Sequence, residues 1–176
     1  MKKVFLLVLP VLLGACSSPS TTVKNNDLIV SNDFESLAGW IPPSNSLNME
    51  QAHSGKYSIK ADPTQPYSMG YNTLLGNAST RRPHKLKLTC WAFLPSEKAA
   101  AHYQMQVIDP VSGEKVYEDG ILMTDQVKTY KSWQEVNKDF TLPDNVTATH
   151  EIRIFLWIAD SPEPVYVDDV QVSIVE

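Results

Sequence analysis

The segment Lys85–Phe93 reads KLKLTCWAF, and an apolar residue occupies every second position along it. Successive side chains of a β-strand point to opposite faces of a sheet, so this period of two predicts a strand with one buried face. The buried face consists of Leu86, Leu88, Cys90 and Ala92. The opposite face carries Trp91 together with Lys85, Lys87, Thr89 and Phe93.

Residues 150–158, HEIRIFLWI, repeat this alternation. The buried face here comprises Ile152, Ile154, Leu156 and Ile158, and the opposite face comprises Glu151, Arg153, Phe155 and Trp157. In segment 102–107, Gln104 and Gln106 alternate with Tyr103, Met105 and Val107. Segment 165–174, VYVDDVQVSI, alternates in the same way, so each of these segments predicts a strand.

Shorter alternating runs predict further strands at 28–31, 47–51, 56–61, 68–75, 115–123 and 133–142. Turn-forming residues such as Pro42-Pro43, Asp109-Pro110 and Pro143-Asp144-Asn145 separate them. Residues 96–101, SEKAAA, are the only stretch with a helical composition. This pattern predicts an all-β fold, an antiparallel β-sandwich, and the number of strands favours the jelly-roll variety.

The N-terminal sequence predicts that the protein is exported from the cytoplasm. Lys2 and Lys3 precede the apolar run 4–13, which is too short to span a bilayer and is typical of a signal peptide. The run ends in Leu13-Gly14-Ala15-Cys16, which resembles the lipobox of bacterial lipoproteins. That resemblance implies cleavage of residues 1–15 and lipidation (palmitate) of Cys16. The alternative is an ordinary secretory signal with an incidental cysteine.

Ser17 after the cysteine favours the outer membrane, and either its periplasmic or its surface side fits. Residues 16–26 form the lipidated cysteine and a polar tether, and residues 27–176 form one β-sandwich domain. The lipid anchor is therefore the only membrane attachment that we expect.

Charge and residue spacing exclude several function classes. The chain has 15 Lys and Arg against 20 Asp and Glu, a formal charge of −5, which argues against a nucleic-acid partner. The histidines are isolated, and Cys90 falls on a buried face. The neighbouring carboxylates Glu118-Asp119 and Asp168-Asp169 point to opposite faces of a strand, so neither pair can act as acid and base on one bond. We expect no catalytic residues and no enzyme activity.

Three fragments carry a family resemblance. They are NDFE at 32–35 followed by Gly39-Trp40, HSGKYSI at 53–59, and YVDDVQV at 166–172. In this order they resemble the galactose-binding-like jelly rolls, in particular carbohydrate-binding modules of the family 4, 9 and 22 type, over residues 27–176. The resemblance implies a structural Ca²⁺ site formed by the Glu35 carboxylate, the Lys56 carbonyl and the Asp168 carboxylate, with Asp33 as a fourth candidate ligand.

The alternation of 165–174 bears on that site, because it predicts Asp168 on the same face as Val170, Val172 and Ile174. An ionised carboxylate among apolar side chains is costly unless it is paired or bound to a metal, and Ca²⁺ prefers oxygen ligands. The alternative is that Asp168 accepts backbone N–H groups and Glu35 is a solvated turn residue.

Aromatic side chains opposite the buried faces predict a ligand platform. If their strands are neighbours in one sheet, the candidate binding residues are Trp91, Gln104, Gln106, Arg153 and Trp157. Flat rings stack on the apolar face of a sugar, and amide or guanidinium groups bind its hydroxyls. The alternative is that a loop, a third layer or a bulge places the tryptophans in packing contacts.

Other aromatic residues predict lesser roles. Tyr67 and Tyr71 are candidates for a second aromatic site, and Trp40 and Trp133 are expected to be structural. The sequence therefore predicts a non-catalytic glycan-binding lipoprotein. The second hypothesis is an envelope assembly lipoprotein that uses the same fold to hold a protein partner.

Overall fold

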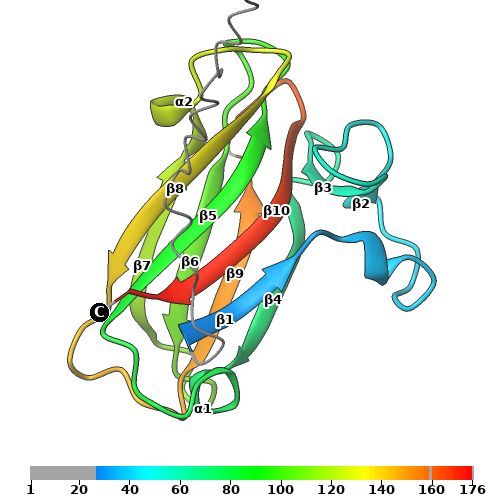
Figure 1. Ribbon diagram of the computed structural model, residues 1–176. Coiled ribbons are helices and arrows are strands. Elements are labelled where there is room, and N and C mark those ends of the chain that lie inside the picture. Colours follow the sequence, from blue (N-terminus) through cyan, green and yellow to red (C-terminus); the bar gives the residue numbers. More distant parts are fainter. Residues whose placement is uncertain (1–26, 159, 176) are drawn as a thin grey trace, which may run out of the picture.

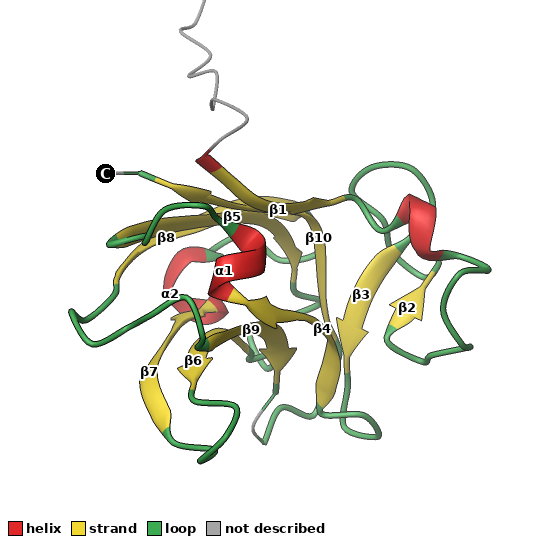
Figure 2. Cartoon of the chain, turned by 90° about the horizontal axis from the view of Figure 1, so that it is seen from below, coloured by secondary structure: helices red, strands yellow, loops and turns green. Residues whose placement is uncertain are grey.

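A computed structural model describes residues 27–158 and 160–175, which fold into two antiparallel sheets packed face to face (Figures 1 and 2). The first sheet has strand order β2-β3-β10-β5-β8, with β1 also paired to β10. Its strands are β1 (Leu28–Asn32), β2 (Leu47–Asn48), β3 (Ser58–Ala61), β5 (Lys85–Phe93), β8 (Trp133–Thr141) and β10 (Val165–Ile174). The second sheet has the order β4-β9-β6-β7. Its strands are β4 (Tyr67–Leu74), β6 (His102–Ile108), β7 (Lys115–Leu122) and β9 (Glu151–Trp157).

The all-β sandwich predicted from the sequence is confirmed. Strands β5 and β10 match their predicted bounds, and the other strands differ by a few residues. The signal peptide, Cys16 and the tether fall in residues 1–26 and lie outside the described residues. Within the described ranges, no helix has the length and apolar character needed to cross a membrane.

The helix predicted at 96–101 is wrong. Pro95 precedes this segment, which forms a turn in which the Ala99 amide donates to the Ser96 carbonyl. Nucleating a helix is costly, and about one turn of sequence between two strands cannot recover that cost. The helices are instead η2 (Glu35–Leu37), a 3-10 turn, and the single turns α1 (Leu75–Ala78) and α2 (Met123–Gln126).

The core lies between the sheets and consists of the alternating apolar faces predicted for each strand. Leu86 and Leu88 of β5 are fully buried, as are Ile152 and Leu156 of β9. Burying each such side chain stabilises the fold by roughly 1.5–3 kcal/mol. Because these apolar faces point inward, every intervening residue of β5 and β9 must point outward.

The edges of the two sheets meet along one side of the sandwich. Strands β1 and β3 both pair with β10, one after the other, and β4 is the edge strand of the second sheet. The Tyr71 hydroxyl of β4 donates to the Ile29 carbonyl of β1 at 3.4 Å, which links the two edges. The 3-10 turn η2 follows β1 directly on this side (Figure 1).

A β-bulge in β10 changes the face on which Asp168 lies. The register against β5 shifts between Asp168 and Gln171, and Asp169 has a left-handed φ of 47°. Asp168 pairs with Trp91, so it shares the outer face with that residue, whereas Val172 pairs with the inward-facing Leu88. The predicted common face of Asp168 with Val170, Val172 and Ile174 is therefore wrong, because the bulge inserts one extra residue.

Candidate functional site

The outer face of the second sheet brings most of the predicted binding residues together. Cross-strand pairing arranges them in rows that run across the strands. An aromatic row pairs Tyr67 of β4 with Trp157 of β9 and His102 of β6. The next row, here called the glycine row, consists of Gly70, Phe155, Gln104 and Gly120. The third row is polar and consists of Asn72, Arg153, Gln106 and Glu118.

The aromatic row presents a flat surface. The rings of Tyr67 and Trp157 are stacked with an interplanar angle of 15° and centroids 6.2 Å apart. The His102 ring lies 5.5 Å from Trp157 on its other side, and Phe155 lies 6.1 Å from Tyr67. Tyr67 is 55% exposed, so at least this ring of the stack is accessible to a ligand.

The β4 end of the glycine row, at Gly70 and Phe155, lines a hollow beside the aromatic row, whereas the Gln104 side chain lies against Gly120 at the other end. A Cβ at Gly70 would lie 2.7 Å from the Ile154 carbonyl, and a Cβ at Gly120 would lie 2.6 Å from the Gln104 Oε1 atom. Side chains at the two ends of the row would therefore collide with the sheet or with Gln104. A hollow of about 480 Å³ opens over this region, lined by residues of β4, β6 and β9 that include Tyr67, Asn72, Gln106, Arg153 and Phe155.

The polar row is held in place by its own contacts. Gln106 Nε2 donates to Glu118 Oε1 at 2.7 Å, and Arg153 Nε donates to Glu151 Oε1 at 2.6 Å. These contacts leave part of the amide and guanidinium groups free for a ligand. By contrast, Gln104 Oε1 is buried and has no hydrogen-bond partner among the described residues.

Trp91 does not belong to this face. Strand β5 lies in the first sheet and β9 in the second, and both tryptophans point away from the core that separates the sheets. The prediction that Trp91 and Trp157 share one platform is therefore wrong. It assumed that β5 and β9 were neighbours, whereas the neighbours of β5 are β8 and β10.

A loop covers Trp91 instead, as the alternative considered from the sequence proposed. The His53 ring stacks on the indole with centroids 3.8 Å apart and an interplanar angle of 11°. His53 Nδ1 lies 2.6 Å from Asp169 Oδ2, which fixes the imidazole over the indole. The outer face of the first sheet therefore places Trp91 in a packing contact.

The remaining aromatic predictions have mixed outcomes. Trp133 packs between His53 and Phe93, with centroid distances of 5.8 and 5.6 Å, in agreement with a structural role. The structural role predicted for Trp40 is wrong, because this side chain is 89% exposed in the loop after η2. Tyr67 and Tyr71 both line the hollow over the second sheet, and Tyr71 also lines the cavity between the sheets, so the second aromatic site stays a prediction.

The three predicted calcium ligands lie around one loop, at 53–57. Glu35 Oε1 accepts the backbone N–H groups of Lys56 and Tyr57, both at 2.7 Å. Asp168 Oδ2 accepts those of His53 at 2.8 Å and Ser54 at 3.2 Å. The bonds to Asp168 fit the alternative considered from the sequence, whereas Glu35 accepts two backbone amides and is not the solvated turn residue of that alternative.

Nothing else in the described part of the chain adds a metal ligand. No group of three or more His, Cys, Asp or Glu side chains there is arranged to hold a metal ion. Asp33 lies on the exposed turn and accepts the Glu35 amide at 3.2 Å. Burial raises the pKa of Asp168, and the backbone N–H groups of His53, Ser54 and Asp169 oppose this shift. The calcium site stays a prediction.

Two sets of titratable groups were singled out in the sequence, the thiol of Cys90 and the neighbouring carboxylates Glu118 and Asp119. Cys90 is fully buried, and burial raises the pKa of its thiol, so the reactive thiolate is disfavoured. Glu118 lies on the outer face beside Gln106, whereas Asp119 contacts Lys138 of the first sheet at 2.7 Å. The two carboxylates therefore point in opposite directions, as the strand period predicts.

The family assignment follows from a match to a family model. The model CBM_4_9, described as a carbohydrate binding domain, matches residues 26–164. The chain belongs to this family. Its β-sandwich therefore has the architecture of a carbohydrate-binding module, as the fragments of sequence indicated.

Solved structures of such modules share the fold. The C-terminal family 22 carbohydrate binding module of Clostridium thermocellum Xyn10B is 17% identical, with a TM-score of 0.58, covering 86% of this chain and 96% of that module. The CBM22-1 xylan-binding domain of Paenibacillus barcinonensis Xyn10C is 16% identical, with a TM-score of 0.54, covering 88% of this chain and 98% of that domain. No curated protein matches the chain.

The sequence-based prediction did not assign a role in the site to Gly70 or Gly120, and it placed Tyr67 just before a strand. A glycine inside a strand pattern often marks a close approach of backbone or ligand, and this signal was available at both glycines. Tyr67 precedes the strand predicted at 68–75, and only the pairing with Trp157 places it on the outer face.

Proposed function

We propose that the outer face of the second sheet binds a glycan, with Tyr67 and Trp157 as the stacking surface and Gln104, Gln106 and Arg153 as hydrogen-bonding groups. The observation that carries the proposal is the aromatic row lying directly beside the glycine row. A pyranose presents an apolar face and a rim of hydroxyls, and this face offers a flat apolar surface next to planar polar groups.

The glycine row sets the direction in which we expect a bound ligand to lie. Residues of one row lie on neighbouring strands about 4.8 Å apart, so the four positions from Gly70 to Gly120 span roughly 14 Å. The aromatic and polar rows each lie about 7 Å away along the strands and form the two walls. A short oligosaccharide running across the strands would contact both walls at once.

Gln104 supports the proposal by its unmet hydrogen bond. A buried acceptor without a donor costs about 1–3 kcal/mol, so a ligand hydroxyl that reaches it recovers that cost. Gln104 pairs with Phe155, which lines the hollow, and the terminal torsion of a glutamine is soft, so its carbonyl oxygen can turn toward a ligand on this face.

Retention on immobilised polysaccharide tests the proposal, with xylan as the first probe because similar modules are described as xylan-binding. We expect Trp157→Ala and Tyr67→Ala each to weaken binding by about tenfold to a hundredfold, the loss of one aromatic contact in a binding site. Trp40→Ala is the matched control, since this indole is 89% exposed and lies outside the site. Binding of Trp157→Ala equal to that of the parent, in a folded protein, would exclude this face.

We further propose that Cys16 carries the lipid anchor and that the tether holds the domain at the outer membrane. The lipobox-like residues 13–16 support this, and metabolic labelling with palmitate tests it. Label in the parent and none in Cys16→Ser is expected. A protein partner in the envelope remains the second hypothesis, and reproducible co-purification of one protein without any glycan retention would favour it.

A further inference from the structure

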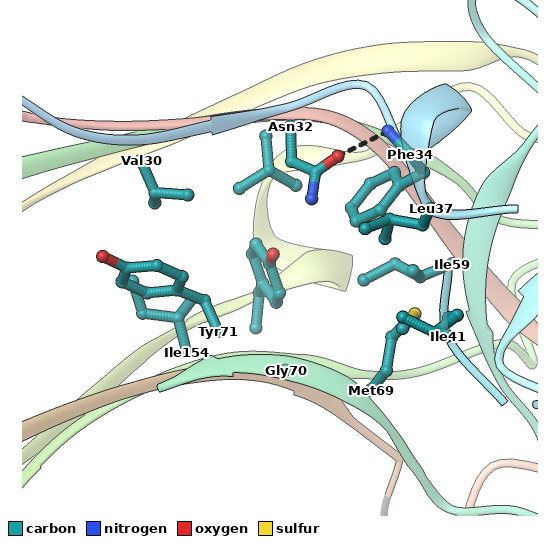
Figure 3. A pocket seen from close by; sticks show the side chains of 12 residues that line it. Val30, Asn32, Phe34, Leu37, Ile41, Ile59, Met69, Gly70, Tyr71 and Ile154 are labelled. Carbon is teal, nitrogen blue, oxygen red and sulfur yellow. Dashed lines mark hydrogen bonds between the residues drawn. The ribbon is translucent and has the colours of Figure 1, made fainter. Parts of the chain in front are cut away.

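The cavity between the two sheets carries an inference that goes beyond the outer face. It has a volume of about 230 Å³ and lies at the edge where β1 and η2 meet β4 (Figure 3). Its walls are mostly apolar and include Val30, Phe34, Leu37, Ile41, Met69 and Ile154. Protein interiors are packed to near-crystalline density, so a cavity of this size beside a well-formed core is unusual.

Three polar groups line this cavity. The Tyr71 hydroxyl makes only the 3.4 Å bond to the Ile29 carbonyl. Tyr103 is 3% exposed, and its hydroxyl has no hydrogen-bond partner among the described residues. Asn32 uses its Oδ1 atom to accept the Phe34 amide at 2.7 Å, and its side chain points into the cavity with the amide nitrogen free (Figure 3).

Two of these groups are donors that lack acceptors. Burial raises the pKa of Tyr103 well above its ordinary value, so its hydroxyl stays protonated and can donate. A hydroxyl without a partner on a residue that lines a cavity can donate to an acceptor on a ligand there. The complementary ligand therefore carries an oxygen acceptor.

The charge of the residues that line the cavity further restricts the class of ligand that can bind. Neither lysine nor arginine is among the residues that line the cavity, so an ionised carboxylate would lose its hydration without gaining a counter-charge. A neutral carbonyl, as in an ester, meets the free donors without that cost.

The volume of the cavity limits the length of the ligand. A cavity of about 150 Å³ binds benzene, which has six heavy atoms, so about 230 Å³ holds roughly nine by proportion. A full-length phospholipid acyl chain does not fit, whereas an ester of a six-carbon acid does. We propose that this cavity is a binding site for a short, neutral acyl ester, held by hydrogen bonds from Tyr103 and Asn32 to its carbonyl oxygen.

Methyl hexanoate is a suitable probe, titrated into the ¹⁵N-labelled domain and followed by NMR. We expect saturable shifts at residues that line the cavity, and none at the Gln106 and Arg153 positions of the outer face. Val30→Phe fills the cavity and should abolish binding, whereas the matched Val111→Phe, at a site 95% exposed, should bind like the parent. Phospholipid vesicles should not compete.

Tyr103→Phe gives a second test that does not depend on filling the cavity. Loss of one neutral hydrogen bond should weaken methyl hexanoate binding about fivefold to tenfold. Cyclohexane, which has no acceptor, should bind the variant and the parent equally. Equal ester affinity in the parent and Tyr103→Phe would overturn the assignment, as would shifts that never saturate. Xylan retention by Tyr103→Phe should be unchanged, so failure here leaves the glycan proposal standing.

Discussion

The two glycines at the ends of the glycine row allow the site to be changed in two ways: Gly70 lines the hollow, and Gly120 lies against the Gln104 side chain. In Gly120→Ala, the new methyl group would lie 2.6 Å from Gln104 Oε1, the far end of a flexible side chain, and 3.1 Å from the Tyr103 carbonyl. Gln104 must move by roughly 1 Å to restore ordinary contact, at a cost of about 0.5–1.5 kcal/mol in torsional energy.

The fold should tolerate this change. Replacing glycine stabilises by about 0.4–1 kcal/mol through the unfolded chain, which offsets most of the torsional cost. We expect the Tm of Gly120→Ala to lie within about 3 °C of the parent, because 1 kcal/mol shifts the Tm of a domain this size by roughly 2–4 °C. Glycan binding should fall by about fivefold to tenfold, the loss of one hydrogen bond, because the Gln104 carbonyl is displaced.

Gly70→Ala is the contrasting variant at the other end of the row. Its methyl group would lie 2.7 Å from the Ile154 carbonyl, and a backbone atom cannot move aside as the Gln104 side chain can. Overpacking of this kind costs about 1–3 kcal/mol, so the Tm should fall by several degrees. Calorimetry and affinity electrophoresis on both variants check the two effects. Full glycan affinity in Gly120→Ala would refute the role given to Gln104.

Three further predictions concern stability and reactivity. The Thr64 hydroxyl and the backbone amides of Thr64 and Gln65 lower the pKa of Asp62 to about 2. Ionised Asp62 therefore adds at most about 2 kcal/mol to the free energy of unfolding, and this contribution is present above pH 4 and lost as the pH falls through 2. Asp62→Asn should accordingly lower the Tm at pH 7 and not at pH 2. If Ca²⁺ occupies the predicted site at Glu35, the Lys56 carbonyl and Asp168, EDTA should lower the Tm by several degrees and CaCl₂ should restore it; an unchanged Tm would show that the backbone amides alone satisfy the two carboxylates. Cys90 should resist Ellman's reagent until the domain unfolds, and rapid reaction of the native protein would show that β5 opens locally.

Local features of the sequence predicted the strands well. The alternation in β5 and β9 is a property of each segment alone, so the buried faces of Leu86, Leu88, Ile152 and Leu156 followed directly. The assignment of strands to sheets did not follow, because it depends on pairing between distant segments. Strand β5 pairs with β8 and β10, and β9 pairs with β4 and β6, so Trp91 and Trp157 face opposite sides.

The bulge at Asp169 is a second feature that could not be predicted from the sequence. Alternation continues through YVDDVQV in the sequence, and nothing there marks which aspartate is the extra residue. Asp169 adopts a left-handed φ of 47°, a conformation that aspartate tolerates better than most residues. The shift moves Asp168 from the predicted core face to the outer face, where the loop at 53–54 supplies its hydrogen bonds.

The pairing of the first and last strands determines how the domain responds to mechanical load. Leu28 lies opposite Ser173, and β1 runs antiparallel to β10, so both ends of the domain leave from the same corner (Figure 1). A force that separates the two ends breaks the hydrogen bonds between β1 and β10 one after another, like a zipper, instead of shearing them together. We expect single-molecule pulling between the two ends of the domain to detach β1 at low force. Pulling between residue 27 and a ligand bound to the second sheet should require a higher unfolding force.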